Sequence, residues 1–167
     1  MVEIEAARIG RPGLAGLEVS DGDALTRLFY RLSPESVYRR FFSPLSRPDQ
    51  LRASLARLDH HDRAAVAAVE GGEIVGVAQY SRAPGARHAD LAIVVADGWQ
   101  RQGLGMRLVA ALAERAAAEG IEGFAVDIQG DNYGAQRLFK RVAPGARLAF
   151  SAGVGEGFIP LPREDER

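Results

Sequence analysis

The run Gln100-Arg101-Gln102-Gly103-Leu104-Gly105-Met106 lies between two segments of different periodicity, and this arrangement decides the fold. Before it, residues 91–96 form a continuous apolar run typical of a buried strand. After it, residues 105–119 carry apolar side chains at helical spacing. A strand that turns through glycines into a helix presents unpaired backbone N–H groups at the positive end of the helix dipole, which suits phosphate oxygens. The run therefore predicts a phosphate-binding turn.

The spacing of the glycines excludes two other common phosphate loops. A P-loop requires a lysine and then a serine or threonine after its last glycine, whereas Gly105 is followed by Met106 and Arg107. A dinucleotide-binding fingerprint requires three glycines at its own spacing in an early βαβ unit, which this chain lacks. On these residues alone, a strand-to-helix turn that binds no ligand is the alternative.

A second motif follows in the chain. Residues 121–128 alternate as in a half-buried strand, and residues 133–141 follow Asn132 with helical spacing. The two patterns, Q-x-x-G-x-G from Gln100 and N-x-x-A-x-x-L from Asn132, resemble the GNAT superfamily of N-acetyltransferases. The resemblance implies an α/β fold of mixed α+β type, in which a twisted mixed sheet of about six to seven strands is flanked by helices. It also implies acetyl-CoA as co-substrate, with no metal.

Length and composition agree with a single domain over residues 1–167, with the motif-bearing core at about 64–142. The net charge of −1 gives no global attraction to nucleic acid or membranes. The absence of cysteine excludes disulfides, thiolate zinc sites and a cysteine nucleophile. The first residues do not form a signal peptide, and no apolar run is long enough to span a membrane, so we expect a cytoplasmic protein.

Periodicity and turn residues predict the remaining elements. We expect a strand within residues 2–19, helices near 21–29, 33–42 and 48–58, and a hairpin of strands 64–69 and 73–80 around Gly71-Gly72. A further strand is expected at 88–96, and final strands near 147–150 and 158–161.

Residues 32–42 are similar to a helical segment of bacterial protein-lysine acetyltransferases of the Pat type. This similarity implies a protein lysine as the acceptor. Alternatively, the segment's aromatic residues Tyr38, Phe41 and Phe42 are core residues that pack on the sheet. An acetyltransferase of small amines and a non-catalytic acyl-CoA-binding module are the alternative functions, and the chain is expected to be a monomer or a homodimer.

Acetyl transfer to lysine requires a route for the amine's proton, because an amine with a pKa of about 10.4 is almost fully protonated at pH 7. Asp90 lies at the start of the central strand, where Pat-type proteins place an acidic residue, and the resemblance favours it as the base. Asp127 lies where other GNAT branches place a catalytic glutamate. A water relay is a third route. Without such roles, Asp90 is a solvated strand-end charge and Asp127 pairs with an arginine.

The proton donor departs from the family pattern. Phe139 occupies the position of the usual tyrosine and has no proton to donate. Tyr133 is one substitute, and a thiolate whose pKa is about 8.5 also departs without an acid. His60 and His61 lie in a polar loop and are expected at the surface rather than at a metal.

The resemblance also assigns the cofactor contacts. The main chain of three strand residues should pair with the pantetheine amides as an added strand would: Ile93, Val94 and Val95. Backbone amides of the turn should hold the pyrophosphate: Arg101, Gln102, Gly103, Leu104, Gly105 and Met106. Asn132 should contact the pantetheine arm or the pyrophosphate.

Overall fold

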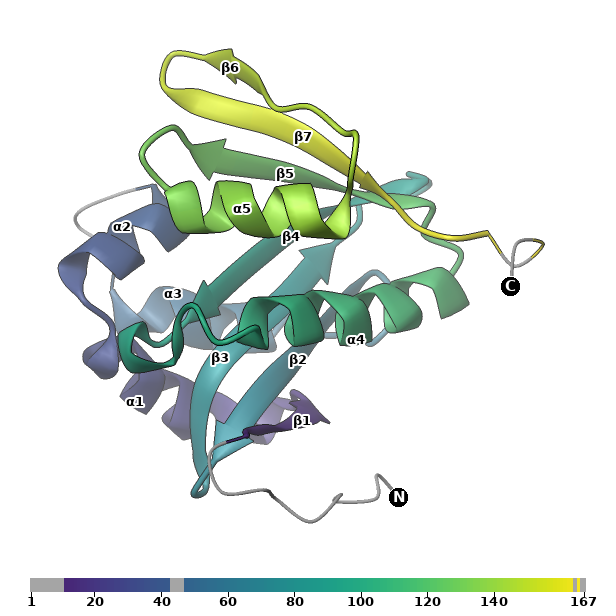
Figure 1. Ribbon diagram of the computed structural model, residues 1–167. Helices are drawn as coiled ribbons and strands as arrows, with labels where there is room; N and C mark the ends of the chain where they lie inside the picture. The colour runs from purple at the N-terminus through teal and green to yellow at the C-terminus, as the bar shows by residue number, and fades with distance from the viewer. Residues whose placement is uncertain (1–10, 43–46, 164, 166–167) are drawn as a thin grey trace.

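A seven-stranded sheet with the order β1-β2-β3-β4-β5-β7-β6 forms the centre of the molecule (Figure 1). The computed structural model describes residues 11–42, 47–163 and 165. The mixed sheet expected from the sequence is confirmed. Its strands are β1 (Gly13–Gly16), β2 (Arg63–Glu70), β3 (Glu73–Ser81), β4 (His88–Val95), β5 (Gly123–Gln129), β6 (Ala149–Ser151) and β7 (Val154–Pro160).

The helices lie on both faces of this sheet, with α4 and α5 in front of it in Figure 1. They are α1 (Gly22–Arg31), α2 (Pro34–Phe41), α3 (Pro48–Leu55), α4 (Leu104–Ala118) and α5 (Tyr133–Val142), with short 3-10 turns η1 (Val19–Asp21) and η2 (Asp97–Trp99). Helix α3 ends three residues before the predicted Leu58. The β2–β3 hairpin turns through Gly71 and Gly72 at φ of 57° and 78°, which a glycine pair adopts without steric cost. Residues 2–10 of the first predicted strand lie outside the described residues.

One junction in the sheet differs from the others. Strands β4 and β5 are parallel and pair at only three positions, the last being Asp90 with Ala125, whereas the other neighbouring strands are antiparallel. Beyond Asp90 the two strands part. The sheet therefore has an opening between β4 and β5 that starts at Asp90.

The core is densest where α4 packs on the sheet. Leu108, Leu112 and Ala116 of α4 are completely buried, as is Phe124 of β5, which stacks on Tyr80 of β3 with the ring centroids 6.0 Å apart. Burying a leucine side chain stabilises a fold by about 1.5–3 kcal/mol, so this contact holds β3, α4 and β5 together around the opening.

The direction of each β4 side chain follows from Gly76 of β3. A Cβ atom on Gly76 would lie 3.1 Å from Leu108 of α4, and Gly76 pairs with Val95. Val95, and every second residue of β4 before it, therefore faces α4 and α5. Asp90 faces the opposite side, toward α1 and α2. On β5, Phe124 faces α4, so by the same alternation Asp127 shares the face of Asp90.

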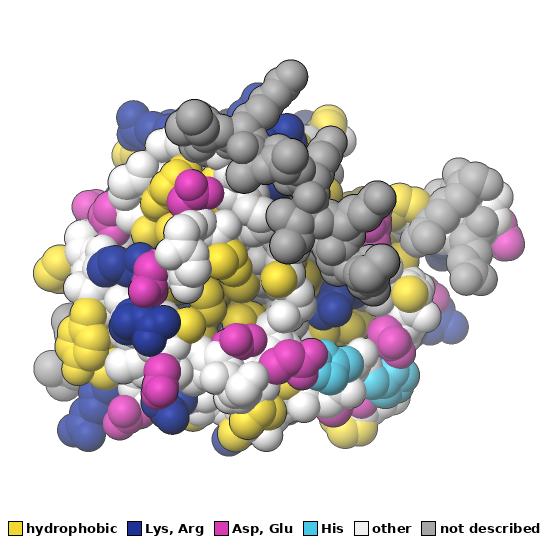
Figure 2. All heavy atoms as spheres, turned by 90° about the horizontal axis from the view of Figure 1, so that it is seen from below, with side chains coloured by type: hydrophobic (Ala, Val, Ile, Leu, Met, Phe, Trp, Pro, Cys, Tyr) yellow, Lys and Arg dark blue, Asp and Glu magenta, His cyan; other side chains and the backbone are white. Residues whose placement is uncertain are grey.

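The surface carries charges of both signs without a large patch of one sign on the face seen in Figure 2, where histidines adjoin acidic side chains. His60 pairs with Glu18 at 3.1 Å, and His61 pairs with Glu119. In the described part of the chain, no group of three histidine, aspartate or glutamate side chains could hold a metal ion. No helix there is long and apolar enough to cross a bilayer.

Candidate active site

The turn after β4 is held in two unusual backbone conformations. Arg101 has a φ of 62° and Gly103 a φ of 78°, both in the left-handed region. For a residue with a side chain this conformation costs about 1–3 kcal/mol, and such strain is common at ligand-binding sites. Gly103 is the N-cap of α4, and no side chain among the described residues caps this helix. The N–H groups of the first turn of α4 are therefore free to meet a ligand.

The two glycines of the turn have different tasks. Nothing lies within 4 Å of a Cβ built on Gly103, so the left-handed φ is the reason for glycine there. A Cβ on Gly105 would lie 3.1 Å from Leu138 of α5 and 3.8 Å from Ile93. Gly105 thus lets α5 approach α4 closely, in addition to leaving the backbone of the turn accessible. From the sequence, both glycines were predicted only as parts of the phosphate-binding turn.

A cleft of about 760 Å³ runs between this turn, β4, α2 and α5. The predicted cofactor residues that line it are Ile93, Val94, Val95, Arg101, Gly103, Leu104, Gly105, Met106 and Asn132. Gln102 does not line it: its side-chain amide donates to the Gly98 carbonyl at 2.9 Å, and it faces a smaller cavity of about 340 Å³. The prediction for Gln102 concerned its backbone amide, so this side-chain contact leaves it a prediction.

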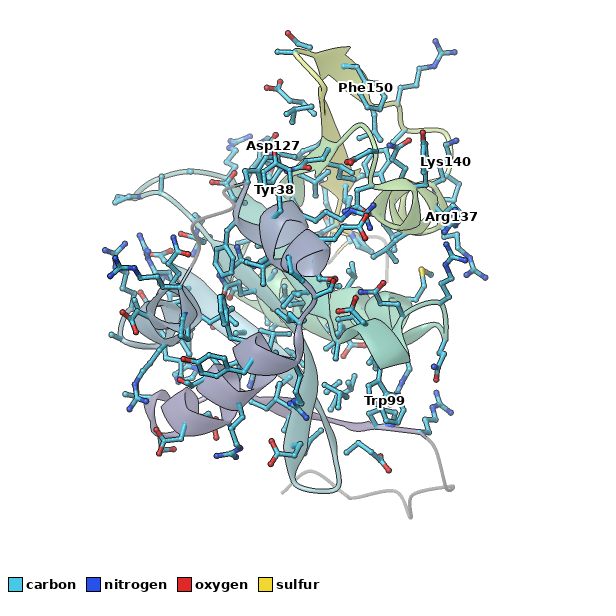
Figure 3. The ribbon with its side chains drawn as sticks, turned by 90° about the vertical axis from the view of Figure 1, so that its left-hand side faces the viewer. Tyr38, Trp99, Asp127, Arg137, Lys140 and Phe150 are labelled. Carbon is cyan, nitrogen blue, oxygen red and sulfur yellow. The ribbon has the colours of Figure 1, made fainter. Side chains whose placement is uncertain are left out.

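Positive charge surrounds the cleft. Its lining includes Arg39 and Arg40 of α2, Arg101 of the turn, and Arg137, Lys140 and Arg141 of α5. No aspartate or glutamate of the described residues lines it. Figure 3 shows Arg137 and Lys140 together on α5. A cleft with charge of one sign and low-dielectric walls concentrates ligands of the opposite sign, so this one suits a molecule with several phosphates.

The edge of β4 that faces the opening is the second binding feature. Past Asp90, no described strand pairs with β4 on the side of β5, so backbone groups of Ile93 to Val95 on that side have no ladder partner there. The Val95 carbonyl instead accepts from the Gln100 side chain at 3.0 Å. An extended ligand with amide groups can add to such an edge as a strand does.

Asn132 begins α5 and caps it. Its side-chain oxygen accepts from the backbone N–H of Ala135 at 3.1 Å, which leaves the side-chain NH₂ for other contacts. Asn132 lines both the main cleft and a second pocket of about 310 Å³, which residues of α2, β4, β5, α4 and α5 surround. It lies therefore where the two cavities adjoin.

The second pocket brings the two predicted catalytic carboxylates together. Asp90 and Asp127 both line it, both are exposed, and both face the α2 side of the sheet. Neither forms an ion pair with an arginine of the described residues, so the alternative pairing of Asp127 with an arginine is not found among them. Figure 3 labels Asp127 on β5 and Tyr38 on α2.

Tyr133 and His88 lie away from these cavities, whereas Phe139 lines the second pocket. Tyr133 is 65% exposed and lines neither cavity, so it is poorly placed as a proton donor. Phe139 is buried, and a Cβ on Gly157 of β7 would lie 2.8 Å from its ring. His88 is exposed on the same face as Asp90, and its ring lies 4.6 Å from that of Phe158. No described tyrosine replaces the usual acid at the opening.

Helix α2 contributes residues that the sequence did not single out. Arg39 and Arg40 line both cavities. Burial lowers the pKa of Arg40 to about 10, which still leaves it charged at neutral pH, and its guanidinium lies 4.7 Å from the centre of the Phe41 ring. The helical pattern of residues 32–42 was visible, but it did not indicate which face meets the cleft.

The interpretation of the α2 aromatics as core residues was wrong for two of the three. Tyr38 and Phe42 are each 42% exposed, and only Phe41 packs partly against the core. The buried residues of α2 are instead Ser36 and Val37. A buried serine was unexpected, and its hydroxyl accepts from the Gln100 side chain at 3.2 Å.

Known structures with the same fold are numerous. The GNAT domain of S. lividans PAT shares 26% identity with this chain, covers 89% of each chain and superposes with a TM-score of 0.79. A phosphinothricin acetyltransferase from Sinorhizobium meliloti, solved with AcCoA, shares 18% identity over 94% of this chain and 92% of its own, with a TM-score of 0.72. A putative acetyltransferase from Salmonella typhimurium, solved with acetyl-CoA, shares 15% identity over 93% and 96%, with a TM-score of 0.72.

The likeness to the S. lividans domain confirms the Pat-type resemblance of the sequence, and the two lower identities show the fold alone. The model of the acetyltransferase (GNAT) family matches residues 26–143, which is more than half of the chain. This range includes the turn, the opening between β4 and β5, and both carboxylates. The chain is therefore an N-acetyltransferase of the GNAT family.

Proposed function

We propose that this protein transfers the acetyl group of acetyl-CoA to the side-chain amine of a protein lysine. The observation that carries the proposal is the opening between β4 and β5, which joins a positively charged cleft to a pocket with two carboxylates. A phosphate-bearing donor in the cleft and an amine in the pocket would meet at this opening. The Pat-type resemblance of residues 32–42 is the reason for choosing a protein lysine as the acceptor.

The donor binds through backbone groups and charge in this proposal. The N–H groups at the start of α4 hold the pyrophosphate, and the unpaired edge of β4 at Ile93 to Val95 receives the pantetheine amides. Asn132 offers its side-chain NH₂ to the same arm. Arg101 of the turn and the α5 cations Arg137, Lys140 and Arg141 balance the phosphate charges.

The reaction requires deprotonation of the amine, its attack on the thioester and departure of the thiolate. Asp90, directly or through a water, takes a proton from the lysine ammonium, and the neutral amine nitrogen attacks the thioester carbonyl carbon. The C–N bond forms, the tetrahedral intermediate collapses, and the C–S bond breaks. The thiolate leaves without a proton donor, as its pKa of about 8.5 permits. The amide nitrogen loses its second proton to water, and the products are acetyl-lysine and CoA.

Asp90 is the base in this proposal because it stands at the last β4–β5 pair, where the opening starts. Asp127 lies further along β5 on the same face and is the alternative. Because both residues are exposed, a water between carboxylate and amine fits either assignment.

A small amino acid is the second candidate acceptor, and one observation favours it. The pocket that holds Asp90 and Asp127 is also lined by Arg39 and Arg40, so it presents both signs of charge. A zwitterion with an amine and a carboxylate would match this arrangement.

The test is a measurement of CoA release from acetyl-CoA with lysine peptides, lysine-containing proteins and free amino acids. Asp90→Asn and Asp127→Asn serve as matched variants, since each removes one charge from the same pocket. We expect turnover with a protein or peptide lysine, and a loss of about 10²–10⁴-fold in kcat for Asp90→Asn alone. A larger loss for Asp127→Asn would exchange the roles. Turnover with amino acids only would move the acceptor to the second candidate, and binding without any turnover would indicate a sensor.

A further inference from the structure

Helix α2 begins with its N-terminus tied to the segment after β4. The Asp97 side chain accepts from the backbone N–H of Ser33 at 3.0 Å. The Gln100 side chain donates to the Ser36 hydroxyl at 3.2 Å and to the Val95 carbonyl at 3.0 Å. One end of the helix is therefore fixed to the segment that leads into the proposed pyrophosphate turn.

The other end of α2 is tied to the segment after β5. Arg39 donates to the Asp131 carbonyl at 3.2 Å, and the Gln129 side chain donates to the Tyr38 carbonyl at 3.4 Å. Asp131 directly precedes Asn132. Since β4 and β5 part beyond Asp90, α2 spans the opening from one wall to the other, and both of its attachments lie beside predicted cofactor residues.

The contacts of Asp97 form a connected network at the first of these ends. Partial desolvation of Asp97, an exposed residue, opposes its ionisation, but hydrogen bonds from the Ser33 backbone and from the Ser33 and Ser36 hydroxyls outweigh it and hold the pKa of Asp97 below the usual value. The Ser33 hydroxyl also accepts from the Ser36 N–H at 3.1 Å, which caps the helix. Ser36 thus links Asp97 and Gln100 through one hydroxyl.

This end of α2 decides where Arg39 and Arg40 lie, because they occupy the next turn of the same short helix. Both arginines line the acceptor pocket as well as the cofactor cleft. Arg39 also has a buried Nε atom that lacks a hydrogen-bond partner among the described residues. A shift of α2 would displace these cations from the opening without changing the turn itself.

We propose that Asp97 and Gln100 are positioning residues, which hold α2 across the opening so that Arg39 and Arg40 stay in place over the acceptor pocket. They act on the acceptor through α2 and contact neither the carboxylates nor the reacting amine. The kinetic part of this proposal rests on the proposed acetyl transfer, because it requires an acceptor. The structural part does not.

The first experiment compares Asp97→Ala, Asp97→Asn and Gln100→Ala with the wild type. Asp49→Asn, an exposed aspartate in the first turn of α3, is the matched control. We expect the acceptor KM to rise about tenfold in Asp97→Ala and Gln100→Ala, while the dissociation constant of acetyl-CoA changes less than twofold in calorimetry for Asp97→Ala. Gln100 also lines the cofactor cleft, so its variant is judged by the acceptor KM alone. Asp97→Asn should recover part of the loss, because its amide oxygen still accepts from Ser33. The control should match the wild type.

A double-mutant cycle separates a specific contact from general damage. If Gln100 acts through the Ser36 hydroxyl, the combined variant Gln100→Ala with Ser36→Ala should lose no more than the larger single variant. Additive losses would overturn the link through Ser36. An equal loss of acetyl-CoA affinity, or unchanged kinetics in Asp97→Ala, would overturn the positioning role as a whole.

The single tryptophan of the chain gives a readout that needs no acceptor. Trp99 lies between Asp97 and Gln100, so its fluorescence reports on this segment. We expect acrylamide to quench Trp99 at least twofold more strongly in Asp97→Ala than in the wild type or in Asp49→Asn. If no amine is acetylated but this difference appears, the proposed function fails while the anchoring of α2 stands. Equal quenching in all variants would overturn the anchoring.

Discussion

The turn after β4 and helix α2 both line one cleft, but they are built in different ways. The turn uses backbone groups: two residues with left-handed φ, an N-terminus without a side-chain cap, and glycines. Helix α2 uses side chains, and its position depends on hydrogen bonds to residues far away in the chain, such as Asp97 and Gln129. A binding site made of backbone groups can keep its ligand while substitutions in the side chains of α2 alter which acceptor is bound.

The largest effect is expected from a substitution that disrupts the turn after β4. Gly105→Val places side-chain atoms where a single Cβ already lies 3.1 Å from Leu138. Such overpacking costs about 1–3 kcal/mol, so we expect urea to unfold the variant earlier and the dissociation constant of acetyl-CoA to rise by at least about tenfold. The added variant Leu138→Ala should recover part of the affinity by making room. Unchanged binding in Gly105→Val would mean that α4 and α5 adjust freely.

A moderate effect is expected from the cations that line the cleft. Arg137→Gln and Lys140→Gln each remove one charge from α5, and we expect each to weaken CoA binding about threefold to tenfold at low salt. The difference should shrink as salt screens the charge. Titration with dephospho-CoA is the matched comparison, because it lacks the 3′-phosphate. A loss of the same size for both ligands would place these cations at the pyrophosphate.

The pH dependence of stability tests how Asp97 contributes to the attachment of α2. Because the pKa of Asp97 is lowered in the folded protein, its contribution to stability is present above the unfolded pKa and is lost as pH falls through the folded value. We expect the wild type to be more resistant to urea than Asp97→Asn above about pH 5, and the difference to fade below about pH 4. The urea midpoints of both proteins across this range are the measurement. A constant difference would exclude the Asp97 charge as its source.

The smallest effect is expected at Tyr133. Because its side chain is largely exposed and lines neither cavity, Tyr133→Phe should change kcat by less than twofold. A pH–rate profile that loses its alkaline limb in this variant would contradict the view that the thiolate leaves without an acid. Tyr38→Phe is the control, since Tyr38 lies on α2 rather than on α5.

The sequence predicted what depends on neighbours in the chain. The apolar run of residues 91–96, the glycines and the helix after them are local signals, and together they located the turn and most of the lining of the cleft. The alternation of residues 121–128 placed Asp127 on one face of a strand. Asp90 and Asp127 line one pocket because the β4–β5 register pairs Asp90 with Ala125. Periodicity in the sequence does not specify this register.

Which side chains of α2 are buried was not predicted, for a related reason. Whether Ser36 or Tyr38 is buried depends on Gln100 and on the course of β4, not on the helical pattern of residues 32–42. The role of Gly105 in helix packing also requires a partner, Leu138, from another helix. A single sequence does not specify the contacts between helices and strands, even where it predicts each helix and strand.

The parting of β4 from β5 after Asp90 has a consequence for the exchange of amide hydrogens with solvent. Along β4 past this point, the amides that face β3 are held in a ladder, whereas those that face the opening have no strand of the described residues beside them. In the empty protein, alternate residues of one strand should therefore exchange at very different rates. A donor laid along this edge would slow the fast set alone, and a mass or NMR measurement could then trace its course residue by residue before any acceptor is known.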